Sequence, residues 1–123
     1  MTRIQQASMV KVFSQADFDN FARLSGDNNP IHTDPDFSAN TRFGRTVAHG
    51  LLLCSVLRGL IDRLMPDQHL SEQSVMFPAP TYADEPMNFT VSMVSNSTGE
   101  LELEVKRMDD GVVTCQGHAR VMT

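Results

Sequence analysis

The second half of the chain alternates apolar and polar residues with the period of a β-strand. Three runs show this alternation, over residues 87–93, 101–106 and 113–121. Successive side chains of a strand point to opposite faces, so each run predicts a strand with one face on a core. Turn-forming residues separate the runs at 96–99 and 109–111 and predict an antiparallel meander.

Residues 50–65 follow a different pattern, which predicts a long helix. The polar residues Ser55, Arg58 and Asp62 recur at helical spacing and form one narrow stripe, while most other positions are Leu, Val, Ile or Cys. A helix that is apolar around most of its circumference is typical of a buried helix. Pro66 predicts where it ends.

The first 44 residues predict one short strand and two helices. Residues 9–13 and, later in the chain, residues 74–77 have short apolar runs that predict strands. Ser14 and Asp17 are spaced as a weak capping box, which starts a helix that Gly26 ends. The following Asp-Asn-Asn-Pro run predicts irregular backbone, and a short helix is expected from Pro35 to near residue 44.

Helices in the first half followed by strands in the second predict an α+β fold. A chain of 123 residues is the length of one domain, so we expect a single domain over residues 1–123. The simplest packing is a curved antiparallel sheet wrapped around the long helix.

Composition excludes several classes of protein. The net charge of −5 argues against a nucleic-acid binder, and no apolar run is long enough to span a membrane. Cys54 and Cys115 are each flanked by apolar residues and are interpreted as buried, reduced thiols. Residues 1–6 contain no apolar signal region. These features predict a cytoplasmic protein.

Asp27 and His32 are the first candidates for chemistry. A carboxylate and an imidazole on one short, rigid loop can converge on a single water molecule. The alternative is that Asp27 serves only an ordinary turn and that His32 is structural. Spacing alone leaves both interpretations open.

His49 and Gly50, at the start of the long helix, are the second candidate. The first turn of a helix has free N–H groups and a partial positive charge, and glycine lets a ligand oxygen approach the backbone. This is how an oxyanion hole is built. The alternative is that Gly50 only permits a tight turn into the helix.

Arg58 and a possible metal site complete the candidates. Arg58 either pairs with Asp62, four residues on, or contacts a ligand. His32, Asp34 and His49 could in principle bind a metal ion, but their spacing is not that of a zinc site, so we expect none.

Two segments together resemble the hydratase motif of the MaoC-like hotdog family. They read LSGDNNPIHTD over residues 24–34 and TRFGRTVAHG over residues 41–50. The resemblance continues through Phe77-Pro78-Ala79-Pro80 and the strands. It implies a hotdog fold, the activity of an R-specific enoyl-CoA hydratase and a homodimer formed edge to edge, and no cofactor.

The resemblance also implies roles for individual residues. Asp27 and His32 become the catalytic pair, the Gly50 N–H stabilises charge on the thioester oxygen, and Asn29 orients the site. Arg42 is the first candidate for binding the phosphates of an acyl-CoA substrate, and Arg45, Arg63 and Lys106 are the others. Arg58 departs from the family, which commonly has a serine lining the site at this position; its guanidinium therefore predicts either a different acyl pocket or a pair with Asp62.

Two alternative functions stay open at this point. One is a 3-hydroxyacyl dehydratase acting on thioesters of acyl-carrier protein, which uses the same chemistry. The other is a catalytically silent hotdog subunit of a heteromeric dehydratase, which should lack the acid/base pair that this chain retains.

Overall fold

The computed structural model describes residues 5–123, so the first four residues of the segment considered for a signal sequence lie outside the described part. Strand β1 comes first, and four helices follow it. The remaining four strands complete the chain. The elements are β1 (Gln6–Val12), α1 (Gln15–Ser25), α2 (Pro30–Thr33), α3 (Pro35–Ala39), α4 (Gly50–Leu64), β2 (His69–Met76), β3 (Pro86–Met93), β4 (Glu100–Arg107) and β5 (Val113–Met122).

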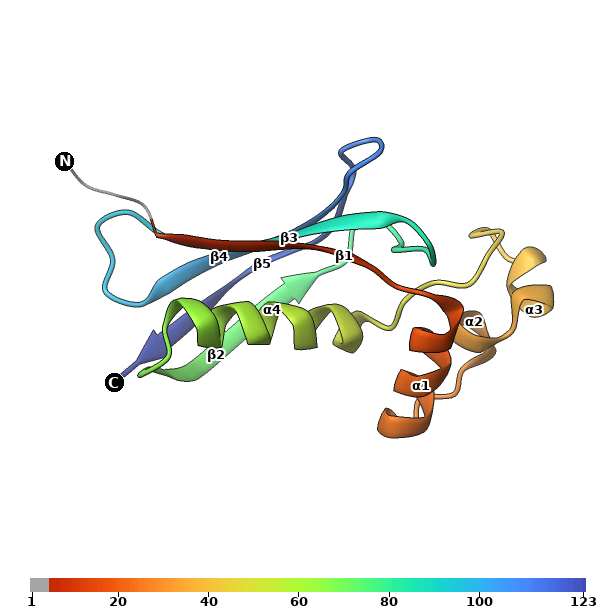
Figure 1. The fold of residues 1–123 in the computed structure, drawn as a ribbon, viewed down its shortest axis with the longest axis horizontal. Helices are drawn as coiled ribbons and strands as arrows, with labels where there is room; N and C mark the ends of the chain where they lie inside the picture. The colour runs from red at the N-terminus through yellow and green to blue at the C-terminus, as the bar shows by residue number, and fades with distance from the viewer. Residues whose placement is uncertain (1–4) are drawn as a thin grey trace.

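The strands form one five-stranded sheet in the order β1-β3-β4-β5-β2, with every neighbouring pair antiparallel. The predicted meander from β3 to β5 is confirmed. Helix α4 lies across one face of the sheet, and α1, α2 and α3 gather at one end of the molecule, beside the start of α4 (Figure 1). The predicted α+β architecture of a sheet around a long helix is therefore confirmed.

The core lies between α4 and the apolar face of the sheet. Four side chains of α4 are buried there, and the alternate residues of the strands face them. The buried residues are Leu53, Leu57, Leu60 and Ile61 of the helix, and Met87, Phe89, Val91, Leu101, Leu103, Val105, Cys115, Ala119 and Val121 of the sheet. Burying a side chain of this size contributes about 1.5–3 kcal/mol, so this layer stabilises the helix that carries the site.

Burial of α4 around most of its circumference was expected, and this is wrong for the single chain. The sheet covers only one face of the helix, and among residues 5–123 no second layer covers the other (Figure 1). Leu51 consequently remains 70% exposed. The apolar side chains of this open face are available to a partner.

The caps of the N-terminal helices follow the sequence. Ser14 and Asp17 form the predicted capping box, and Gly26 ends α1 with φ +81°. The interpretation of residues 27–30 as irregular is wrong at its last residue, because Pro30 is the first residue of α2 and Asn29 caps that helix. Proline suits this position, since the N–H that it lacks would have no partner within the helix.

Three predicted boundaries are also wrong. Strand β1 spans Gln6–Val12 rather than residues 9–13. Helix α3 ends at Ala39 rather than near residue 44, because the Thr41 hydroxyl donates to the Ser38 carbonyl and takes the chain out of the helix. Strand β2 begins at His69 rather than at residue 74. Strand β2 lies at the edge of the sheet, and much of its surface is exposed. Its hydrogen bonds to β5 define it, and no alternation of apolar residues in the sequence predicts it.

Candidate active site

Asp27 and His32 lie close together, as predicted. The Oδ2 atom of Asp27 is 3.9 Å from Nε2 of His32. The other carboxylate oxygen, Oδ1, accepts the backbone N–H of Asn29 at 3.3 Å, which fixes how the carboxylate is turned. The side chain of Asn29 is itself occupied, because its Oδ1 accepts the N–H of Ile31 and caps α2. Asn29 thus orients Asp27 through its backbone.

The hydrogen bonds of His32 determine which ring nitrogen is free. Its Nδ1 is 2.8 Å from the carbonyl oxygen of Val47. A carbonyl oxygen only accepts, so Nδ1 carries the hydrogen, and in the neutral ring Nε2 carries the lone pair. Gln15 of α1 also holds this residue, by donating to the His32 carbonyl at 2.9 Å. The lone pair of Nε2 is therefore presented on the side of Asp27.

His49 packs beneath this pair. Its ring stacks on His32 with centroids 3.8 Å apart and planes inclined by 23°, and Phe21 meets its ring edge to face at 4.9 Å. Nitrogen and oxygen atoms of Asp27, His32 and His49 lie within 4.8 Å of one another, as in some metal sites. Two imidazoles that share a metal ion aim their nitrogens at one point, whereas these stacked rings lie in nearly parallel planes. The arrangement suits a stacked acid/base cluster better than a metal centre.

Burial lowers the pKa of His49 below its ordinary value of 6.5, and the nearby His32 lowers it further, although Asp27 acts against both. The unfolded chain therefore takes up a proton at this residue at a higher pH than the folded chain does. The stability that His49 contributes is complete above pH 6.5 and is lost as the pH falls through the lower, folded pKa.

We expect the free energy of unfolding of the wild type to fall more steeply between about pH 7 and pH 5 than that of a His49→Gln variant, which cannot titrate at this position. Urea denaturation at a series of pH values measures both slopes. Equal slopes in the two proteins would contradict a depressed pKa at His49.

Gly50 is the first residue of α4, as predicted, so its N–H belongs to the helix end that has no carbonyl partner within the helix. It lies between two cavities, and Phe77 borders both of them. A side chain at position 50 would collide with the Phe77 ring, since a Cβ there would come within 2.6 Å of it. Glycine therefore lets the aromatic ring and the start of the helix approach each other.

The smaller cavity, of about 260 Å³, is lined by Asp27 of the predicted pair but not by His32. Asp27, His49 and Gly50 line it together with apolar residues. The full lining is Phe21, Ser25, Asp27, His49, Gly50, Leu51, Cys54, Val75 and Phe77. An acid/base group and a helix N-terminus thus face one mainly apolar space.

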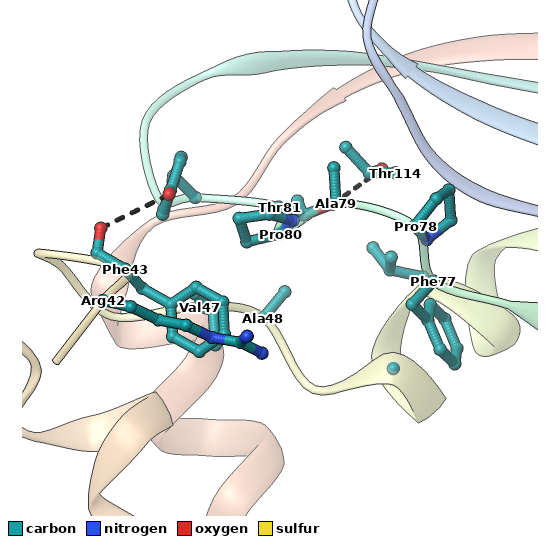
Figure 2. Close-up of a pocket in the computed structure, with 13 residues that line it drawn as sticks. Arg42, Phe43, Val47, Ala48, Phe77, Pro78, Ala79, Pro80, Thr81 and Thr114 are labelled. Atoms are coloured by element: carbon teal, nitrogen blue, oxygen red, sulfur yellow. Dashed lines mark hydrogen bonds between the residues drawn. The ribbon is translucent and has the colours of Figure 1, made fainter.

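The larger cavity, of about 600 Å³, extends from Gly50 toward the loop after β2. Figure 2 shows the Pro78-Ala79-Pro80 loop on one side, Phe77 beside the start of α4, and Arg42 with Phe43 on the other side. The guanidinium of Arg42 lies 4.8 Å from the Phe43 ring centroid. The predicted phosphate-binding arginine therefore stands at a cavity that also contacts Gly50.

Sequence reasoning missed several residues of this region. Thr81 donates from its hydroxyl to that of Thr114 at 2.8 Å, and both are buried beside the larger cavity (Figure 2). Val47, which fixes the His32 tautomer, and Gln15 were missed as well. These contacts join residues that are far apart in the chain, so no local pattern in the sequence predicts them.

Arg58 lies away from both cavities, on the open face of α4. Its Nε is 3.2 Å from Oδ1 of Asp62, and both side chains are about half exposed. This is the ion pair that the spacing of four residues allows. A role toward the acyl chain remains a prediction that the single chain does not support.

We expect Arg58→Ser to leave the acyl chain-length profile unchanged and to cost about 0.3–0.5 kcal/mol of stability, as exposed helix pairs do. Initial rates on a series of enoyl-CoA substrates, with a thermal melt, measure both effects. A shift toward longer acyl chains in the variant would instead place Arg58 in the acyl pocket.

A known protein family matches this chain over most of its length. The family described as MaoC like domain matches residues 2–115. The chain belongs to the MaoC-like domain family. Among curated relatives, the (R)-specific enoyl-CoA hydratase of Aeromonas caviae is 34% identical over 113 residues, covering 89% of this chain and 76% of that protein. The enzyme of the same name from Rhodospirillum rubrum is 31% identical, covering 96% and 85%.

Two solved structures of R-hydratases agree in fold with this chain. The (R)-hydratase of Aeromonas caviae matches with a TM-score of 0.86 and 30% identity, over 98% of this chain and 96% of that one. An unliganded R-hydratase from Pseudomonas aeruginosa matches with a TM-score of 0.88 at 23% identity, over 100% of this chain and 82% of that one, and shows the fold alone. The predicted hotdog fold is confirmed. No helix in the described part is both long and apolar enough to span a membrane.

Proposed function

We propose that this MaoC-like protein hydrates trans-2-enoyl-CoA to (3R)-3-hydroxyacyl-CoA and catalyses the reverse dehydration. The observation that carries the proposal is the 3.9 Å approach of Asp27 and His32 beside the N-terminus of α4. Relatives named as (R)-specific enoyl-CoA hydratases support the reaction class and its stereochemistry.

The acid/base pair is spaced for one water molecule. At 3.9 Å the two groups are too far apart for a direct hydrogen bond, but a water at about 2.8 Å from each can donate to both. Both groups accept, so the water oxygen keeps a lone pair for C3 of the enoyl group. As the water oxygen attacks C3, the pair takes one proton from the water. The pair then returns this proton to C2 and ends in its starting state, so the two groups act as one coupled unit.

Attack at C3 moves negative charge onto the thioester oxygen. The N–H of Gly50 and the dipole of α4 are placed to stabilise that charge, and the apolar residues around them keep the local dielectric low. The thioester itself makes C2 acidic, so the proposed mechanism needs no cofactor.

Arg42 is the proposed contact for the phosphates of CoA. Of the other candidates, Arg45 pairs with Glu85 and Lys106 with Glu104. Arg63 lies in the last turn of α4 and lines neither cavity. Within residues 5–123 Arg42 makes no salt bridge, and its side chain stands at the larger cavity. This cavity would hold the part of the substrate that leads from the thioester to the nucleotide.

We also propose a homodimer that forms along the edge strand β2. Strand β2 lies at one edge of the sheet. Leu51 and Phe77 expose apolar surface next to the smaller cavity, and Met76 does so at the end of the strand. An uncovered edge of this kind invites pairing with a second sheet. Sedimentation velocity is expected to give twice the 13.7 kDa of one chain. A monomer at micromolar concentration would contradict the dimer.

The location proposed for the protein is the cytoplasm. Cys54 and Cys115 are both free thiols, which suits a reducing compartment.

The decisive test is turnover of crotonyl-CoA by the purified protein in buffer with EDTA. Hydration removes the conjugated double bond, so absorbance at the enoyl-thioester band is expected to fall, and chiral analysis is expected to give the 3R product. The same assay with crotonyl-acyl-carrier protein separates the carrier-protein alternative, which shares this chemistry. If the protein turns over neither thioester, the proposed function is contradicted.

A further inference from the structure

We propose that His49 is a positioning residue, which holds Asp27 and His32 in their reactive arrangement through a hydrogen bond and a ring stack. The proposal rests on the proposed hydratase function for its kinetic consequences. His49 comes one residue before Gly50, so a single short segment connects the acid/base pair with the N-terminus of α4.

The hydrogen bond of His49 reaches the backbone of the catalytic loop. Its Nε2 is 2.9 Å from the carbonyl oxygen of Asp27, and that oxygen can only accept. Nε2 therefore carries the hydrogen. Asp27 itself is exposed, whereas His49 is only 2% exposed. The donor thus anchors an exposed loop residue to a buried point of the fold.

The ring of His49 also fixes the plane of the His32 ring. The two rings stack with centroids 3.8 Å apart, while Phe21 of α1 contacts His49 edge to face. His32 is held within this plane by the bond from its Nδ1 to Val47. The ring stack with His49 and the hydrogen bond to Val47 together set the direction in which Nε2 of His32 presents its lone pair to the water.

His49 is suited to this work as a neutral donor. The second ring nitrogen, Nδ1, is buried and has no hydrogen-bond partner among the described residues. Protonation there would bury an N–H without an acceptor and would add a positive charge against His32, which is costly in both respects. The titratable groups that face His49 are Asp27 and His32. A helix cap is not its role, since its side chain makes no capping hydrogen bond.

Two substitutions separate the hydrogen bond from the ring. His49→Phe keeps an aromatic ring against His32 but removes the donor to Asp27. His49→Gln removes the ring but places an amide N–H close to where Nε2 was. His118→Phe is the matched control, because His118 is an exposed histidine of β5 that lines neither cavity.

We expect His49→Phe to lower kcat for crotonyl-CoA by up to about 10²-fold, because small misplacements of reacting groups have effects of this size. KM should stay within about twofold, since the residue does not contact the CoA side of the substrate. His49→Gln should recover part of the lost kcat, because it restores the donor but not the ring, and His118→Phe should match the wild type.

Hydrogen exchange of the backbone amides of residues 26–33 gives a readout that does not depend on turnover. Faster exchange there in His49→Phe than in His49→Gln, with the amides of β3 and β4 unchanged, supports the anchor. Wild-type kcat in His49→Phe, or equal losses in both variants with equal exchange, would overturn it. If the wild type hydrates no enoyl thioester, the proposed function fails, and the exchange comparison still decides whether His49 anchors Asp27.

Discussion

Asp27→Asn and His32→Ala are each expected to lower the rate of crotonyl-CoA hydration by about 10²–10⁴-fold, the range that general acid/base groups contribute. Asparagine keeps the Oδ1 acceptor for the Asn29 N–H but loses the negative charge. Alanine removes Nε2, which faces the Asp27 carboxylate. Steady-state kinetics with circular dichroism measure activity and fold together. The fold should remain, because Asp27 is exposed and His32 is only partly buried.

The double variant provides a second, sharper result. Since the two groups share one water and act as a unit, the double variant should be little slower than either single variant. Asp36→Asn is a suitable control, because Asp36 is an exposed carboxylate on the neighbouring helix α3 and lines neither cavity. Near-wild-type activity in Asp27→Asn or in His32→Ala would remove that residue from the mechanism. Multiplicative losses in the double variant would contradict a coupled pair.

Gly50→Pro is expected to lower turnover by about 10²–10³-fold, which is the effect of removing one oxyanion-hole donor. Proline has no N–H, and it is well accommodated as the first residue of a helix. The preceding residue, His49, already has the extended backbone that proline requires, with φ −62° and ψ 136°. Helix α4 should therefore form normally, and circular dichroism can confirm it.

Gly50→Ala is the control that this prediction needs. Alanine and proline both add a Cβ that would come within 2.6 Å of the Phe77 ring, but alanine keeps the N–H. Phe77 is 46% exposed, and the colliding atoms belong to the far end of its ring, so the ring can turn aside. Turnover in Gly50→Ala should exceed that in Gly50→Pro by at least tenfold. Equal losses would assign the effect to crowding by Phe77 rather than to the missing N–H.

Local patterns in the sequence are sufficient to predict most of the fold. Strands β3, β4 and β5 bury their alternate apolar residues against the apolar face of α4. Periodicity and burial therefore have the same cause. The caps at Ser14 and Gly26 are also local, because they involve neighbouring residues. The first part of strand β2 was not predicted, because hydrogen bonds to β5 define this strand and its own residues do not alternate.

The site could be predicted only in part, for a related reason. The motif places Asp27 and His32 five residues apart, and the structure brings their side chains together. The groups that orient them arrive from elsewhere in the fold, as Val47 and Gln15 do for His32. Spacing along the chain carries no information about such contacts. The open face of α4 is a similar case, since composition indicates an apolar helix without saying which surface covers it.

The segment of residues 26–45 carries the acid/base pair, yet Ser38 is its one buried residue. The segment therefore buries little apolar surface against the rest of the chain. A few hydrogen bonds attach it, among them those of His32 and His49. Segments of this kind open with a smaller free energy than the global unfolding reaction. Catalytic competence and structural integrity are thus separate properties of this molecule. Heat or mild denaturant should disable the enzyme while α4 and the sheet are still folded, and substitutions within the segment should alter turnover more than they alter the melting temperature.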